Sequence, residues 1–151
     1  MSRHPESLRR QPTFVLSRAA TTARRACGEA LAEVGLTQAE HGILACLHEC
    51  GPLMQRDVAA RLALDPADLV AYLDRLEARA AISRRHDAKD RRRRVIEATA
   101  LGRELLARAD DALAAATARL LEPLGPAEAT QLMTILTRLL GAHDPAHWRQ
   151  A

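Results

Sequence analysis

The strongest candidate for chemistry in the sequence is a cluster of cationic side chains in the second half of the chain. Residues 84–94 hold seven basic side chains against Asp87 and Asp90, a local charge of +5, whereas the whole chain carries only +3. Arginine binds phosphate well, and double-stranded DNA carries a negative charge about every 1.7 Å. The cluster therefore predicts contact with a polyanion, with a solvated run of charge as the alternative.

Three cysteines form the second group of reactive side chains. Cys27, Cys46 and Cys50 are too few and odd in number for a disulfide scaffold, so we expect reduced, inert thiols. Cys46 and Cys50 stand four residues apart, which leaves a redox pair or half of a metal site, completed by His41 or Cys27, as alternatives. The segment 101–124 contains no Cys or His to complete coordination. We therefore expect no metal and no cofactor.

Motifs of catalysis and of membrane targeting are missing from the sequence. It has no Gly-rich phosphate loop, nucleophile elbow or metal signature, so we expect that the protein is not an enzyme. No stretch approaches twenty uncharged apolar residues, and residues 1–10 are polar. This pattern predicts neither a membrane span nor a secretory signal, and we expect a cytoplasmic protein.

The elements that must position these side chains are mainly helical. Hydrophobic residues make up 48% of the chain and aromatic residues only 2%, which favours helices over β-sandwiches and barrels. Apolar residues at three- and four-residue steps predict helices over 13–35, 37–50, 54–62, 65–79, 101–124 and 132–140. Two short, partly β-branched runs, 82–86 and 93–99, flank a charged tip and predict a β wing of two or three strands.

Capping residues support several of these helix boundaries. Thr37 followed by Glu40 has the spacing of a capping box at the start of the second helix. Asp65 before Pro66 combines an N-cap with a proline at the first helical position. Gly51 with Pro52 ends the helix between them.

Two short helices, 54–62 and 65–79, followed by a hairpin with a basic tip have the layout of a winged helix-turn-helix. Ala59 is the small residue needed where the two helices cross closely. The turn holds Ala63 in place of the usual glycine, which requires a less favourable backbone at this alanine. In this arrangement the second helix enters the major groove of DNA while an arginine reaches a neighbouring minor groove.

With this layout the sequence resembles the MarR family of bacterial transcription regulators. The matching motifs are Asp90-Arg91-Arg92 with Thr99 and Gly102 in the wing, Leu36-Thr37 at a helix start and Leu76-Glu77 at a helix end. Ala80 and Ala98 depart from the family pattern, which has glycine and leucine there. The resemblance covers residues 14–140. It implies an obligate homodimer whose first and last helices intertwine, which binds a palindromic operator and is released by a small ligand or by oxidation.

The resemblance also implies an organisation of the chain. We expect a mobile N-terminal arm over 1–12, a MarR-like domain over 13–140 and a disordered tail over 141–151. Within the domain, the winged helix-turn-helix spans 37–99, flanked by dimerisation helices over 13–35 and 101–140. The apolar stripes of these flanking helices would expose a large patch in a monomer, which predicts dimerisation, with packing only on each other as the alternative.

The expected interface with DNA combines the wing and the second short helix. The resemblance implies that Asp90 pairs with Arg92 to fix the hairpin and that Arg91, Arg93 or Arg94 enters the minor groove. The full set of predicted DNA-contacting residues is Gln55, Arg56, Pro66, Ala67, Asp68, Val70, Ala71, Arg75, Lys89, Asp90, Arg91, Arg92, Arg93 and Arg94.

The recognition helix offers few hydrogen-bond donors to base edges. Asp68 repels phosphate and can only accept from a cytosine amino group, whereas Ala67, Val70 and Ala71 can touch thymine methyl groups. We therefore expect affinity from phosphate contacts, which include Arg75, and specificity from methyl groups and from minor-groove shape.

The resemblance places an effector pocket near the start of the second helix. Glu40 and His41 stand there, and His41 is a candidate contact for a small anionic or aromatic ligand, with a capping or surface histidine as the alternative. The predicted function is a sequence-specific, double-stranded-DNA-binding transcriptional regulator, expected to be a repressor. The alternatives are a winged-helix module that binds protein through the apolar face of its recognition helix, or a thiol-based redox-sensing regulator.

Overall fold

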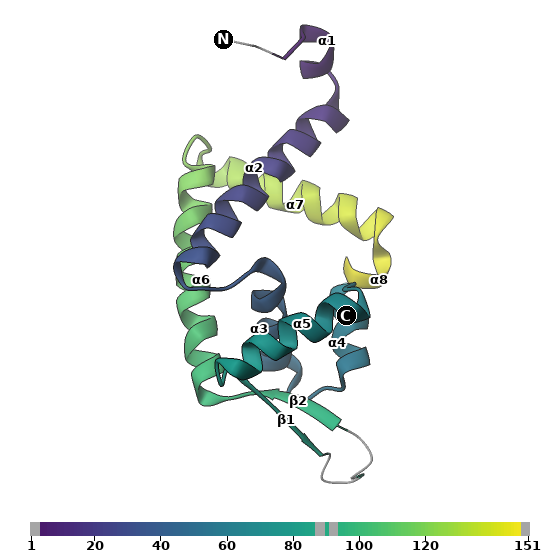
Figure 1. The fold of residues 1–151 in the computed structure, drawn as a ribbon. Helices are drawn as coiled ribbons and strands as arrows, with labels where there is room; N and C mark the ends of the chain where they lie inside the picture. Colours follow the sequence, from purple (N-terminus) through teal and green to yellow (C-terminus); the bar gives the residue numbers. More distant parts are fainter. Residues whose placement is uncertain (1–3, 87–89, 91–93, 149–151) are drawn as a thin grey trace.

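The computed structural model describes residues 4–86, 90 and 94–148, and this part of the chain is mainly helical with one small sheet (Figure 1). Its elements in chain order are α1 (Glu6–Arg9), α2 (Pro12–Glu33), α3 (Gln38–Cys50), α4 (Gln55–Leu62), α5 (Pro66–Ala78), β1 (Ile82–His86), β2 (Arg94–Ala98), α6 (Ala100–Leu121), α7 (Pro126–His143) and α8 (Pro145–Trp148).

The structure confirms the predicted fold class, a mainly helical protein with a small β wing. Strands β1 and β2 pair antiparallel with Ile82 opposite Ala98, and an isolated bridge joins Leu53 to Ile96 beside them. The lobe formed by α3, α4, α5 and the two strands lies at one end of the molecule. The long helices α2 and α6 extend away from this lobe, and α7 begins at the far end of α6 and ends nearer the lobe (Figure 1).

Several boundaries differ from the prediction. Helix α7 begins at Pro126, earlier than expected, because a proline suits the first turn and the Gly125 N–H is satisfied by the Glu128 carboxylate at 2.8 Å. Short helices also occupy part of the expected arm and tail, namely α1 and α8. At α8, the Asp144 carboxylate lies 2.8 Å from Nδ1 of His147.

The hydrophobic core fixes the winged lobe. Its largest fully buried side chains come from α3, α4, α5 and β1 and from the end of α2: Leu31, Ile43, Leu44, Val58, Leu69, Leu73, Leu76 and Ile82. Each such side chain stabilises the fold by roughly 1.5–3 kcal/mol when it leaves water. Because α5 alone supplies three of these leucines, its opposite face must point to solvent.

The predicted caps are confirmed at both helix starts. Oγ1 of Thr37 accepts from the Glu40 N–H at 3.2 Å, and Oε2 of Glu40 accepts from the Thr37 N–H at 2.8 Å, which completes the capping box. Asp65 caps α5 by accepting from the Ala67 N–H at 2.8 Å.

Two alanines adopt the left-handed backbone that the sequence predicts for the first of them. Ala63, between α4 and α5, has φ = 50°, and Ala80, just after α5, has φ = 55°. A side chain in this region costs roughly 1–2 kcal/mol relative to right-handed backbone. Both ends of α5 therefore carry backbone strain that glycine would not.

Gly102 allows the start of α6 to approach the turn before β1. A Cβ atom at this position would lie 1.9 Å from the Ala81 carbonyl oxygen. The same carbonyl accepts from the Thr99 N–H at 3.0 Å, and Oγ1 of Thr99 accepts from the Gly102 N–H at 3.0 Å. Thr99 and Gly102 thus form a close junction between the wing and α6, which gives a physical reason for this part of the wing signature.

Substitution of Gly102 by alanine is expected to destabilise the protein by more than about 3 kcal/mol, since a backbone carbonyl has no room to move aside. Gly28→Ala is the matched control, because a Cβ at Gly28 in α2 meets nothing within 4 Å. The control should gain up to about 1 kcal/mol through helix propensity. Urea unfolding monitored by circular dichroism measures both values, and equal effects of the two substitutions would contradict the close junction.

Candidate nucleic-acid interface and ligand cavity

Helix α5 presents the face that the sequence assigns to DNA. Leu69, Leu73 and Leu76 anchor one side of the helix in the core, so the residues between them face solvent. The predicted base-contacting residues Pro66, Ala67, Asp68, Val70 and Ala71 are all exposed. Val70 is 43% exposed, which makes it one of the large hydrophobic side chains on the surface.

The wing is joined to α5 by an ion-pair network that sequence reasoning missed. Arg84 of β1 places its Nη2 atom 2.6 Å from Oδ1 of Asp74 and its Nη1 atom 3.2 Å from Oε2 of Glu77, both on α5. On the same strand, Arg85 lies 2.8 Å from Oε2 of Glu97. Two members of the cationic cluster therefore meet carboxylates of the protein, and the local charge of +5 overstates what this surface offers to DNA.

The remaining wing residues are only partly described. Arg94 is exposed at the start of β2, and Asp90 is half-buried. Lys89, Arg91, Arg92 and Arg93 lie outside the described residues, and so does the expected pair between Asp90 and Arg92.

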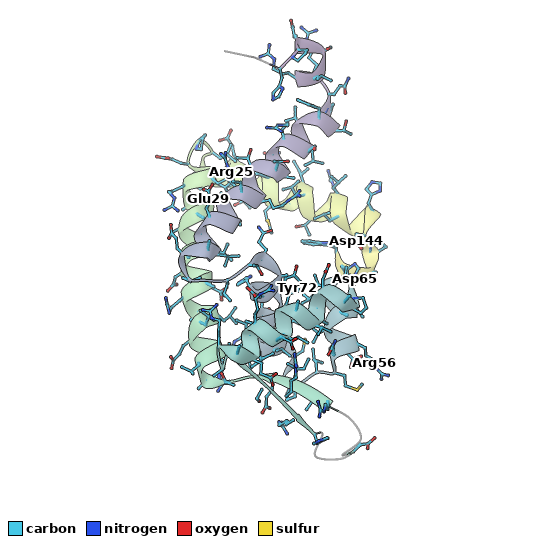
Figure 2. All side chains as sticks on the ribbon, viewed as in Figure 1. Arg25, Glu29, Arg56, Asp65, Tyr72 and Asp144 are labelled. Atoms are coloured by element: carbon cyan, nitrogen blue, oxygen red, sulfur yellow. The ribbon has the colours of Figure 1, made fainter. Side chains whose placement is uncertain are left out.

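Helix α4 contributes to the same side of the molecule. Arg56 is exposed and projects from α4 toward the side that holds the wing (Figure 2). Its contact with Asp57 is long, at 3.6 Å, and Gln55 beside it is half-buried. These two residues stay predicted phosphate contacts.

Arg75 differs from its expected role as a simple phosphate contact. Its Nε atom donates to Oε1 of Glu40 at 2.7 Å, and its guanidinium lies over the Tyr72 ring, 5.0 Å from the ring centre. The Glu40 residue is only 4% exposed. Burial raises the pKa of its carboxyl, but hydrogen bonds from the Thr37 backbone and from Arg75 outweigh burial, so the pKa lies below its usual range.

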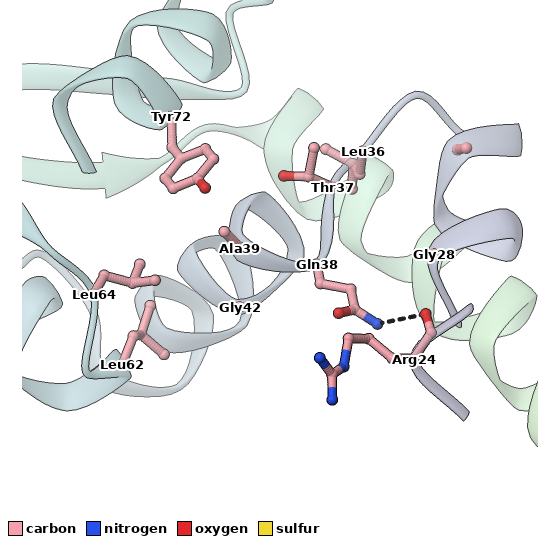
Figure 3. A pocket seen from close by; sticks show the side chains of 11 residues that line it. Arg24, Gly28, Leu36, Thr37, Gln38, Ala39, Gly42, Leu62, Leu64 and Tyr72 are labelled. Atoms are coloured by element: carbon pink, nitrogen blue, oxygen red, sulfur yellow. Dashed lines mark hydrogen bonds between the residues drawn. The ribbon is translucent and has the colours of Figure 1, made fainter. Parts of the chain in front are cut away.

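A cavity of about 670 Å³ lies between α2, α3 and the turn joining α4 to α5 (Figure 3). Its walls are largely aliphatic, with one aromatic ring, one cationic side chain and a few polar groups: Arg24, Gly28, Ala32, Leu36, Thr37, Gln38, Ala39, Gly42, Leu62, Leu64 and Tyr72. Gln38 donates to the Arg24 carbonyl at 3.1 Å, which joins α3 to α2 at the cavity edge.

His41 is not among the residues that line this cavity, although the sequence made it the candidate ligand contact. Its Nε2 atom lies 2.8 Å from Oδ1 of Asp110 on α6. The partner stands 69 residues along the chain, so sequence spacing gave no signal for it. Sequence reasoning missed Arg24, Gln38 and Tyr72, of which only Tyr72 was noticeable, as the one tyrosine of the chain.

The three cysteines are unpaired thiols. Cys46 is buried, Cys50 is exposed and Cys27 is half-buried. Burial raises the pKa of the Cys46 thiol, and the neighbouring Cys50 raises it further, which disfavours a reactive thiolate at this position. Among the described residues, no three His, Cys, Asp or Glu side chains group in a way that suits a metal ion.

Comparison with known proteins places this architecture in a family. The profile described as the MarR family matches residues 36–93. A solved transcriptional regulator of the MarR family from Rhodococcus sp. RHA1 is 31% identical, covers 88% of this chain and 92% of its own, and superposes with a TM-score of 0.75. The chain belongs to the MarR family.

Other similar proteins have names that state a ligand or a function. CouR from Rhodococcus jostii RHA1, solved with p-coumaroyl-CoA, is 31% identical over 93% of this chain and 97% of its own, with a TM-score of 0.76. CouR bound to a 23-mer DNA duplex gives 28% identity, 92% and 99% coverage and a TM-score of 0.82. The curated repressor MdtR of Bacillus subtilis is 36% identical over 64 residues, which is 42% of this chain and 41% of that protein's length.

These findings confirm the predicted family and winged-helix fold. Members of the MarR family are transcription regulators and not enzymes. No helix in the described part of the chain is long and apolar enough to cross a membrane.

The Glu40 carboxylate is expected to stabilise the protein in a pH-dependent way. Because its folded pKa is lowered, its contribution is full above the pKa of an unfolded glutamate, about 4.3, and is lost as the pH falls through the folded value. Glu40→Gln should therefore cost about 1–2 kcal/mol at pH 7 and less at pH 3, because Gln keeps the cap but loses the charged hydrogen bonds.

Urea unfolding at the two pH values measures this difference. Glu49→Gln, at an exposed carboxylate of the same helix, is the control and should show a small effect at both pH values. A cost for Glu40→Gln that is the same at pH 3 and pH 7 would contradict the role assigned to the ionised carboxylate.

Proposed function

We propose that the protein is a transcriptional repressor that binds double-stranded DNA as a homodimer and is released by a small anionic ligand with an aromatic or apolar body. The observation that carries the proposal is the joined wing and recognition helix within a MarR-family chain. Arg84 couples the two elements through Asp74 and Glu77, so that strand β1 of the wing is held against α5. The DNA-bound CouR relative supports the same use of this fold.

The charges around the interface indicate which elements should supply affinity for DNA and which should discriminate between bases. The exposed face of α5 is acidic or apolar at Asp68 and Val70, so it offers few phosphate contacts apart from Arg75. Arg56 on α4 and Arg94 on the wing are exposed cations as well. We expect these and the wing tip to give affinity, and α5 to give discrimination between bases through thymine methyl groups or a cytosine amino group.

A second copy of the chain is needed to cover α7. Among residues 126–143 no side chain is buried, although this helix carries Leu132, Met133, Ile135 and Leu139 with exposed fractions of 36–63%. Val15 and Leu16 near the start of α2 are exposed as well. Exposed apolar side chains of this kind mark a protein interface, and a twofold dimer would present two winged lobes to a palindromic operator.

The cavity between α2, α3 and the α4–α5 turn is the proposed effector site. It is large enough for a small aromatic molecule, its walls are mainly aliphatic, and Arg24 at its edge is the cation that suits a carboxylate. The CouR structure with p-coumaroyl-CoA supports an anionic effector with an aromatic body. The cavity lies between the α2 helix of the proposed dimer and the DNA-binding lobe, a position from which a ligand can alter their relative orientation.

DNA binding is tested by recovering genomic fragments retained by the purified protein and measuring affinity for one fragment across salt concentrations. The logarithm of the binding constant should fall with the logarithm of salt by roughly 0.9 per phosphate contacted. Arg94→Ala should weaken binding and reduce the slope by about one unit. Arg25→Ala on α2, far from the wing (Figure 2), is the charge-matched control and should leave the slope unchanged.

A binding constant that barely responds to salt, or equal slopes for both variants, would overturn the proposed interface. A partner protein bound through the apolar face of α5 is the second candidate, favoured by the exposure of Val70, and it predicts the salt-insensitive result.

The dimer is tested by light scattering. The wild-type protein should have about twice the chain mass of 16.5 kDa, and Ile135→Asp on α7 should give the monomer mass. Leu101→Asp, at another exposed apolar side chain near the wing end of α6, should leave the dimer intact. A monomeric wild-type protein at micromolar concentration, or equal sensitivity to both substitutions, would argue against α7 as the dimer interface.

A further inference from the structure

The cavity and the recognition helix share one side chain, that of Tyr72. It belongs to α5, yet it lines the cavity on the side away from the exposed face of that helix (Figure 3). One turn further along α5, the guanidinium of Arg75 lies over the same ring at 5.0 Å from its centre. A cation over an aromatic face contributes about 0.5–1 kcal/mol at exposed sites and more when it is shielded from water. Arg75 is thus positioned partly by a wall of the cavity.

A buried carboxylate also holds the guanidinium of Arg75. Its Nε atom donates to Oε1 of Glu40 at 2.7 Å, while Oε2 of Glu40 accepts from the backbone N–H and from Oγ1 of Thr37 at 2.8 and 3.0 Å. Glu40 is on α3, and Thr37 again lines the cavity. The chain of contacts Tyr72, Arg75, Glu40, Thr37 therefore begins and ends at the cavity and crosses the contact between α5 and α3.

The difference in solvent exposure between Glu40 and Arg75 determines what their separation costs. The Glu40 side chain is 6% exposed, whereas that of Arg75 is 51% exposed. A buried carboxylate that loses its charged partner suffers a desolvation penalty, while the arginine can return to water at little cost. The contact therefore favours one seated orientation of α5 on α3, and displacement of the Tyr72 ring removes one of the two contacts that hold the Arg75 guanidinium.

We propose that Tyr72, Arg75 and Glu40 are positioning residues that couple occupancy of the cavity to the orientation of the recognition helix. The inference rests on the proposed function and specifies how its effector site acts. With the cavity empty, the Tyr72 ring supports Arg75, Arg75 pairs with Glu40, and α5 is seated for DNA binding. A ligand that displaces the ring removes this support, separates Arg75 from Glu40 and lets α5 leave the seated orientation.

Coupling between two sites is reciprocal, so DNA binding should increase the population of the seated orientation of α5 and of the Tyr72 ring position that belongs to it. The chain contains one tyrosine, and labelling with 3-fluorotyrosine therefore places a single fluorine nucleus in the cavity wall. Adding the operator fragment recovered above should shift the single ¹⁹F resonance, while unrelated DNA of the same length and salt concentration should shift it much less.

Variants that break the contact chain should show a smaller ¹⁹F shift even when they are saturated with DNA. In Glu40→Gln, which keeps the cap of α3, and in Arg75→Met, which keeps the apolar stem, the operator-induced shift at saturating DNA should fall at least about threefold. Glu49→Gln is the matched control, because it removes an exposed carboxylate of α3, the helix that carries Glu40, outside the contact chain and the proposed DNA interface. It should retain the wild-type shift. Two variants at the two ends of the pair keep the test decisive if one of them folds poorly.

Three results would overturn the inference, and they differ in what else they affect. A shift of wild-type size in both Glu40→Gln and Arg75→Met, or no shift in a wild-type protein that binds its operator, would remove the coupling and leave the proposed function intact. A protein that binds no DNA sequence specifically would overturn the proposed function and this inference together.

Discussion

The burial of one leucine stripe on α5 is the constraint on which the rest of the structure depends. Leu69, Leu73 and Leu76 are each fully buried against the other helices of the lobe, and their helical spacing leaves the opposite face in solvent. That face, the wing that Arg84 joins to it, and the cavity behind Tyr72 are all placed by this packing. A charge or a large cavity in the stripe would disturb the proposed DNA and ligand sites at once.

Charged side chains determine which parts of the lobe, once packing has positioned them, can attract DNA. The cationic cluster is distributed between two tasks, since Arg84 and Arg85 meet carboxylates of the protein while Arg94 stays exposed. The recognition helix keeps an acidic and apolar surface at Asp68 and Val70, so we expect most phosphate contacts from other elements. This separation suits a protein in which nonspecific attraction and base discrimination reside on different parts of the lobe.

Features that depend on neighbours in sequence were predictable, and those that depend on distant partners were not. The capping box at Thr37, the cap at Asp65 and the strained Ala63 follow from local backbone rules, and the amphipathic spacing predicted every long helix. Sequence spacing gave no signal of the partners of His41 and Arg75, because Asp110 stands 69 residues from His41 and Glu40 stands 35 residues from Arg75. The resemblance placed a pocket near the start of α3, but most residues that line the cavity escaped prediction for the same reason, since its walls come from three separate segments.

The two left-handed alanines stand at Ala63 and Ala80, one on each side of α5. When this helix detaches from the lobe, both alanines relax to ordinary backbone, and the energy recovered offsets part of the lost packing. The free energy of opening around α5 is therefore lower than the depth of its burial suggests, and its amide hydrogens should exchange faster than those of α3 or α6. Glycine at either position, as the family pattern has, would raise the free energy needed to open α5 and would slow the detachment of this helix from the lobe.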